Sequence, residues 1–65
     1  MGTNTADFEN VEALRDTKKA LLCKIDGQEL WVPKSQIHDD SEVWEVGHEG
    51  KLVVTEWWAM QKGLV

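Results

Sequence analysis

An Asp-Gly dipeptide at residues 26 and 27 lies between two apolar runs, residues 20–25 and 30–32. A two-residue type I′ turn needs positive φ at both central positions, which Asp tolerates and Gly adopts freely. The pattern therefore predicts a β-hairpin whose loop is Asp26-Gly27. A two-residue loop also sets the register, and the expected cross-strand pairs are Ile25 with Gln28, Lys24 with Glu29, Cys23 with Leu30, Leu22 with Trp31, and Leu21 with Val32.

This register gives the hairpin two unlike faces, because alternate residues of a strand point to opposite sides. One face is uniformly apolar and is predicted to face the core; it carries Leu21, Cys23, Ile25, Leu30 and Val32. The other face carries Leu22 opposite Trp31, beside the opposed charges Lys24 and Glu29, a pair worth about 0.2–1 kcal/mol. A strongly curved sheet buries residues on both sides, so the sequence leaves open whether Trp31 is covered or exposed.

The segment before the hairpin, residues 8–15, has no uniformly apolar side. In a strand, Phe8 and Leu14 lie on one side and Val11 lies on the other. A short amphipathic helix fits the pattern almost as well. We favour a strand, because the hairpin needs a partner strand in so small a β domain, with Asp16-Thr17 as the turn between them.

The chain after the hairpin contains its only proline, Pro33, which has no N–H for a sheet ladder and therefore ends the third strand or lies on an edge. Residues 35–40 are predicted to form an irregular crossing with one helical turn and a buried anchor at Ile37. The next elements are predicted in order as a short strand at residues 43–46, a tight turn at residues 47–50 and a central strand at residues 51–55.

The C-terminal segment, residues 56–62, is predicted to be a helix with a signal at each end. Thr55 can cap its N-terminus, Glu56 complements the helix dipole, and Gly63 can end it in the left-handed conformation. Helical spacing places Trp57, Met60 and Leu64 on one stripe, which we expect to face the core. Trp58 lies on a different side, with Gln61 and Lys62.

With 65 residues the chain is expected to form one domain. Its predicted class is mainly β (small α+β), an antiparallel four- to five-stranded SH3-like or OB-like barrel or sheet with a short C-terminal helix. Residues 7–65 are expected to form this domain, and residues 1–6 a disordered or vector-derived N-terminus. Cys23 has no second cysteine for a disulfide, which favours a reducing cytoplasmic location. No apolar run approaches the roughly 20 residues of a membrane span, so we expect no membrane segment.

Three stretches of the sequence are similar to a known group of proteins. They are Leu-Trp-Val-Pro-Lys-Ser-Gln-Ile at residues 30–37, Glu-Trp-Trp-Ala at residues 56–59 and Lys-Gly-Leu at residues 62–64. Together they resemble short uncharacterised proteins encoded by bacteriophages and prophages. The resemblance implies a phage or prophage setting and a site of action in the host cell cytoplasm, and it carries no catalytic residues over to this chain.

The residue types that bind metals or catalyse reactions lack the arrangements those functions need. Possible metal ligands, without the paired short spacings of a zinc site, are Cys23, His38, Asp39, Asp40, His48 and Glu49. Ser35, His38 and the two aspartates supply the letters of a hydrolytic triad, but neighbours on one loop more often cap turns. We therefore predict a non-enzyme with no cofactor and no metal site.

The four tryptophans carry the most functional information. An exposed Trp31 and an exposed Trp58 would form an apolar patch suited to a partner, because tryptophan is prominent among interface hot spots. The leading interpretation is a small acidic protein-interaction module that binds an unknown host or phage protein, as a monomer or a homodimer. Its candidate binding residues are Trp31, Leu22, Trp58, Lys24, Lys34, Asp39 and Asp40.

Two alternatives remain open from the sequence. Four lysines near Trp31 suit a weak single-stranded nucleic-acid binder; they are Lys18, Lys19, Lys24 and Lys34. The net charge of −5 disfavours that interpretation, because phosphate binding depends on cations. A concentration of acidic residues favours a DNA-mimic inhibitor instead; these are Asp39, Asp40, Glu42, Glu45 and Glu49.

Overall fold

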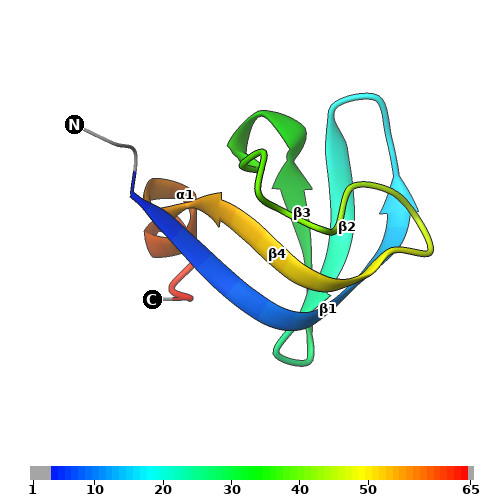
Figure 1. The fold of residues 1–65 in the computed structure, drawn as a ribbon, viewed down its shortest axis with the longest axis horizontal. Coiled ribbons are helices and arrows are strands. Elements are labelled where there is room, and N and C mark those ends of the chain that lie inside the picture. The colour runs from blue at the N-terminus through cyan, green and yellow to red at the C-terminus, as the bar shows by residue number, and fades with distance from the viewer. Residues whose placement is uncertain (1–3, 65) are drawn as a thin grey trace.

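The computed structural model describes residues 4–64 and consists of one antiparallel sheet with a short helix at its end (Figure 1). The elements in chain order are β1 (Thr5–Asp16), β2 (Ala20–Ile25), β3 (Gln28–Pro33), the 3₁₀ turn η1 (Lys34–Gln36), β4 (Glu49–Thr55) and α1 (Glu56–Gln61). The four strands lie in the order β3-β2-β1-β4. The predicted mainly β class with a C-terminal helix is confirmed.

The hairpin of β2 and β3 has the predicted turn and register. Asp26 and Gly27 have φ of 51° and 81°, as a type I′ loop requires. All five predicted cross-strand pairs are present. The predicted core face is buried, with Leu30 only partly covered. Pro33 is predicted to end the third strand or to lie on an edge of the sheet. It does both, because it is the last residue of β3 and β3 is an end strand.

The segment that the sequence left ambiguous is a strand, β1, and a bulge explains its irregular pattern. Asn10 adopts φ of 56°, and the pairing of β1 with β4 shifts register between Phe8 and Val11. The extra residue moves the alternation by one position. As a result Ala6 and Phe8 before the bulge, and Val11 and Ala13 after it, all pack into one core.

β1 is longer than predicted and pairs with a neighbour along each edge. Its residues 5–12 pair with β4 and its residues 12–16 pair with β2. Thr5 and Ala6, which the sequence analysis assigned to a disordered N-terminus, are therefore strand residues. Residues 1–3 of that predicted segment lie outside the described residues.

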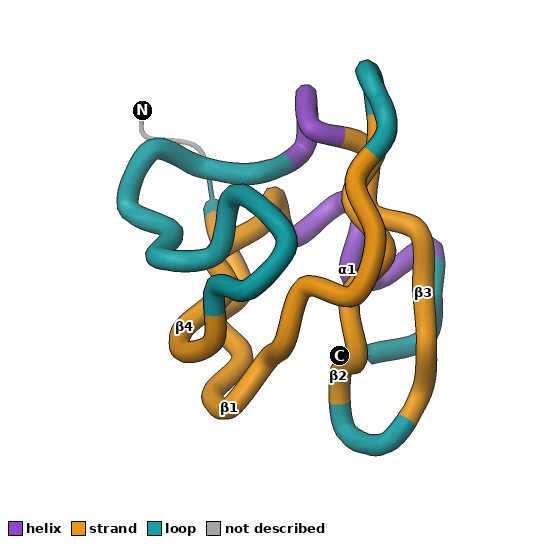
Figure 2. Tube along the Cα trace, turned by 90° about the vertical axis from the view of Figure 1, so that its right-hand side faces the viewer, coloured by secondary structure: helices purple, strands orange, loops and turns teal. Residues whose placement is uncertain are grey.

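The long connection from η1 to β4 lies along the outer edge of β4 (Figure 2). Ile37 is buried as predicted and forms an isolated antiparallel bridge with Val54. The His38 N–H donates to the Val53 carbonyl at 2.8 Å, and further along a second backbone bond joins Glu42 N–H to the Lys51 carbonyl at 2.9 Å. These contacts satisfy backbone groups that would otherwise be free on an edge strand.

The predicted strand at residues 43–46 is wrong, as is the extent of the turn after it. The Trp44 N–H donates to His48 Nδ1 at 3.1 Å, and the Val43 N–H donates to Ser41 Oγ at 3.3 Å. Local side-chain acceptors thus take the place of a strand ladder. The turn lies at Val46-Gly47, and β4 already begins at Glu49. The strand predicted at residues 51–55 exists, but it is an end strand of the sheet and not a central one.

Helix α1 begins and ends at the predicted signals, but the prediction of its buried face is wrong. The Thr55 hydroxyl accepts from the Trp58 N–H at 3.3 Å, and Gly63 has φ of 71°. After the helix, Gly63 N–H bonds to the Met60 carbonyl and Leu64 N–H bonds to the Ala59 carbonyl. This Schellman motif turns the chain back, so Leu64 reaches the core beside Ala59 and does not extend a helical stripe. The buried helix residues are Trp58 and Ala59.

The left-handed conformation of Asn10 generates a prediction about stability. We expect Asn10→Val to lower the free energy of unfolding by roughly 1–2 kcal/mol, because a side chain branched at Cβ is strained at positive φ. Asn10→Gly should leave it within about 0.5 kcal/mol of the original value. Urea unfolding measures both variants, and equal losses in the two would contradict the assigned role of the bulge.

The buried thiol of Cys23 generates a prediction about alkaline stability. Burial raises the pKa of Cys23 from its ordinary value of 9.0 to about 11. Between these values the unfolded chain has released the thiol proton while the folded chain retains it, so stability falls as pH rises. We expect a loss of about 2 kcal/mol between about pH 8 and about pH 10.5. Cys23→Ala should lack this component of the pH dependence in matched urea titrations; identical pH profiles would contradict it.

Candidate functional site

The outer face of the hairpin is partly open and is centred on Trp31. Leu22 and Trp31 are direct cross-strand partners, and 47% of the Trp31 surface is exposed. On the other side of Leu22, β1 places Arg15 as its register partner. The row Arg15–Leu22–Trp31 therefore crosses three strands, with an exposed cation at one end and an exposed indole at the other.

Two lysines near this row have acidic neighbours. Lys24 is paired across the sheet with Glu29 on one side and Glu12 on the other. The Nζ of Lys34 lies 2.5 Å from Oδ1 of Asp16, so its charge is already engaged. The two lysines predicted as binding residues thus have acidic neighbours within the domain, whereas Arg15, Lys18 and Lys19 are exposed and take part in none of the ion pairs found among residues 4–64.

Trp58 is a candidate binding residue on the condition that it is exposed, and that condition fails: its side chain is only 3% exposed and packs in the core. Its neighbour Trp57 is 63% exposed, and Met60, one helical turn later, is 58% exposed. Residues three apart on a helix share a face. The exposed face of α1 therefore carries two large apolar side chains that the sequence analysis assigned to the core.

A groove of about 480 Å³ lies beside this helix face; it is lined by Asn4, Gln36, Thr55, Glu56, Trp57 and Met60. Two hydrogen bonds join residues of this lining. The Thr55 hydroxyl donates to Gln36 Oε1 at 2.5 Å, and the Glu56 N–H donates to the Asn4 carbonyl at 3.0 Å. Glu56 is the one charged residue of the lining. The groove thus combines an apolar wall, neutral polar groups and one carboxylate.

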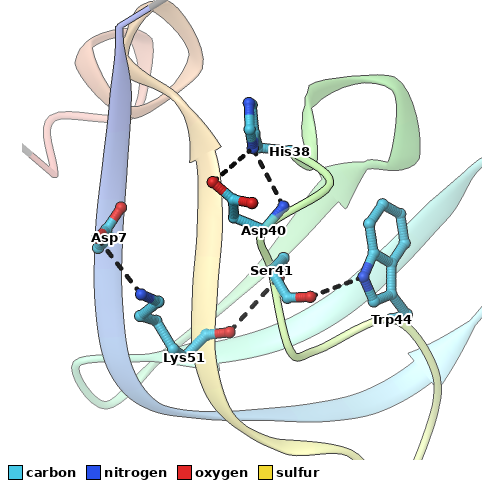
Figure 3. Close-up of polar contacts among 6 residues, drawn as sticks. All are labelled: Asp7, His38, Asp40, Ser41, Trp44 and Lys51. Carbon is cyan, nitrogen blue, oxygen red and sulfur yellow. Dashed lines mark hydrogen bonds and ion pairs between the residues drawn. The ribbon is translucent and has the colours of Figure 1, made fainter.

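Asp39 and Asp40, the acidic residues predicted to bind a partner, are exposed in the connection that borders β4. The Asp40 N–H donates to His38 Nδ1 at 3.1 Å, and Asp40 Oδ2 lies 3.6 Å from the same nitrogen (Figure 3). The next residues hold this loop down: the Trp44 indole N–H donates to the Ser41 carbonyl at 2.8 Å. The bond between Trp44 and Ser41 thus fixes the loop, while the carboxylates of Asp39 and Asp40 stay exposed to solvent.

The described residues contain no cluster of metal-ligating side chains and no reactive thiol. Among residues 4–64 no group of three or more His, Cys, Asp and Glu side chains is placed to hold a metal ion. Cys23 is buried as a neutral thiol, which makes it a poor nucleophile. In the same part of the chain, no helix is both long enough and apolar enough to cross a membrane.

Comparison of the chain with protein-family models, with curated proteins and with solved structures gave no match. The site is therefore defined by its own geometry.

Sequence reasoning missed Trp57 and Met60 as surface residues. The signal that would have found them is Gly63, because a helix that ends there cannot place Leu64 on the same stripe as Trp57. With Leu64 removed from the pattern, the small residue Ala59 beside Trp58 marks the side on which the helix closely approaches the sheet.

Trp58 is buried and its neighbour Trp57 is exposed, so we expect truncation of the two side chains to have very unequal effects on stability. Trp58→Ala should lower the free energy of unfolding by about 3–5 kcal/mol, as expected for a core aromatic, or leave the chain unfolded. Trp57→Ala should change it by no more than about 0.5 kcal/mol. Urea unfolding followed by circular dichroism compares them, with Trp58→Phe as a milder variant. A larger loss for Trp57→Ala than for Trp58→Ala would show the helix faces to be reversed.

Proposed function

We propose that this chain is a non-enzymatic protein-interaction module that binds a partner protein through the α1 groove. The observation that supports this function is the exposure of Trp57 and Met60 on one helix face, in the lining of a groove whose other residues are joined by hydrogen bonds. Exposed tryptophan next to a preformed groove is the arrangement in which a few side chains supply most of the binding energy. The proposal includes the phage or prophage setting and the cytoplasmic location that the sequence motifs imply.

The chemistry of the groove selects the partner segment. Trp57 and Met60 favour an aliphatic or aromatic anchor side chain. The carboxylate of Glu56 favours a lysine or arginine next to that anchor, which can also stack on the Trp57 ring. The net charge of −5 adds long-range attraction for a basic partner. The expected ligand is therefore a cationic-apolar segment of a protein.

Single-stranded nucleic acid is the weaker proposal for this domain. Trp31 offers a ring for base stacking, but phosphate binding also needs free cations. Lys24 and Lys34 both have acidic neighbours, which leaves the exposed Arg15, Lys18 and Lys19 to act against a net charge of −5. The acidic loop at Asp39 and Asp40 favours a basic protein surface or DNA mimicry over binding of DNA itself.

For the fold we propose an SH3-like or OB-like barrel. The bridge between Ile37 and Val54, with the two backbone bonds beyond it, brings the segment after β3 onto the far edge of β4. That contact draws the two ends of the sheet together through the segment after β3 and leaves the outer edge of β3 itself unpaired among residues 4–64, as in a partly open barrel.

An array of synthetic peptides with systematic Lys, Arg, Leu and Trp content tests the proposed function. We expect selective binding of peptides that carry both an apolar anchor and a cation. Trp57→Ala should weaken that binding at least about thirtyfold, since a hot-spot tryptophan contributes about 2 kcal/mol or more. Fluorescence polarisation of labelled peptides gives the dissociation constants.

Trp31→Ala is the matched control and should bind the same peptides normally, because its ring lies on the hairpin and not in the groove lining. Peptides that bind wild type and Trp57→Ala equally would refute the α1 groove as the site. A labelled single strand whose affinity falls steeply with salt, and is lost in Trp31→Ala, would establish the nucleic-acid alternative instead.

A further inference from the structure

The free edge of β3 points to a second interaction surface, separate from the α1 groove. Among residues 4–64, β3 lies at one end of the sheet and pairs only with β2, whereas the outer edge of β4 at the other end is bordered by residues 37–42. We propose that β3 pairs in antiparallel fashion with β3 of a second copy of this chain, about a two-fold axis at Trp31.

The outward-facing backbone groups of β3 follow from the hairpin geometry. In a two-residue hairpin the residues next to the loop, Ile25 and Gln28, exchange hydrogen bonds, and every second pair does the same. The bond from Lys34 N–H to the Lys19 carbonyl, at 2.8 Å, continues this alternation past the end of β3. Glu29 and Trp31 therefore direct both backbone groups away from β2, and within residues 4–64 those groups have no protein partner.

Pro33 also fits this edge. It occupies the third outward position, where its missing N–H costs no bond to β2. β3 carries no bulge, and its single charged residue is Glu29. Bulges, charges and prolines are the usual devices that keep edge strands from pairing. Between the turn and Pro33, β3 is thus a regular edge strand with few features that prevent pairing. Its outward N–H and C=O groups can bond to another extended strand.

The β3 strand of a second copy matches this edge when the two Trp31 residues lie directly opposite each other. In that register Trp31 exchanges two backbone bonds with its counterpart, and each Glu29 N–H donates to the Pro33 carbonyl opposite. The two half-exposed indoles become a direct cross-strand pair on the outer face. On the core face, half-buried Leu30 is placed opposite Val32. Moving the axis to Leu30 would lose the indole pair and bring the two Glu29 carboxylates closer, so we assign the axis to Trp31.

The net charge of −5 on each copy opposes association. The salt dependence of association therefore distinguishes a dimer from a complex with nucleic acid. Salt screens the repulsion between two acidic copies, so the dimer should strengthen as ionic strength rises. Nucleic-acid binding would weaken under the same change.

Sedimentation equilibrium over a wide range of protein concentration and at two salt concentrations tests the dimer. Glu29→Pro removes an outward N–H and leaves the ladder to β2 intact, whereas Glu29→Ala keeps that N–H. We expect wild type and Glu29→Ala to dimerise, and Glu29→Pro to dimerise at least about tenfold more weakly, because each dimer loses two hydrogen bonds. Trp57→Ala should dimerise normally, which separates this surface from the α1 groove.

Hydrogen exchange of the wild-type chain provides a readout that does not depend on a variant folding. The amides of Glu29 and Trp31 should be protected at high protein concentration and exposed at low concentration. A chain that stays monomeric at every concentration would overturn the proposal. So would a dimer unaffected by Glu29→Pro, or one lost in Trp57→Ala.

Discussion

The fold depends on a single strand, β1, that pairs with a different neighbour along each part of its length. Residues 5–12 bond to β4 and residues 12–16 bond to β2, so both halves of the sheet are joined through it (Figure 1). A strictly alternating strand would turn either Phe8 or Val11 to water. The extra residue at Asn10 shifts the alternation, and both side chains reach one core. The bulge at Asn10 therefore lets side chains from both parts of β1 pack into a single core.

The two end strands of the sheet differ in how their outer edges are covered. The outer edge of β4 is bordered by the connection from Ile37 onward, which uses backbone bonds to Val53 and Lys51. β3 has no such cover among the described residues. The long connection from Ile37 to β4 thus covers one edge of the sheet. It contains no further strand, and its backbone bonds go to β4.

Sequence reasoning succeeded where one local rule determines the geometry and failed where the geometry depends on an inserted residue or a chain reversal. The Asp26-Gly27 turn specified every pair of the hairpin, because a two-residue loop admits one register. The phase shift at Asn10 was not predictable from alternation alone, since the bulge breaks the period on which that reasoning rests. The exposed part of the candidate site was assigned to the core for a related reason: Leu64 follows a reversal at Gly63 and so falsely completed a helical stripe.

The exposure of Trp57 and of Trp31 follows from how the core is filled. Consecutive helix residues point about 100° apart, so a helix that buries Trp58 beside Ala59 must turn Trp57 toward solvent. In the same way the strand that buries Val32 must direct Trp31 outward. Neither exposed indole is needed to complete an interior that Trp58, Leu52 and Val54 already fill. Large apolar side chains that the fold does not require are free to serve binding, and they lie on two different elements, α1 and β3. Under the two proposals made above, the partner and the second copy therefore occupy different elements of the same small domain.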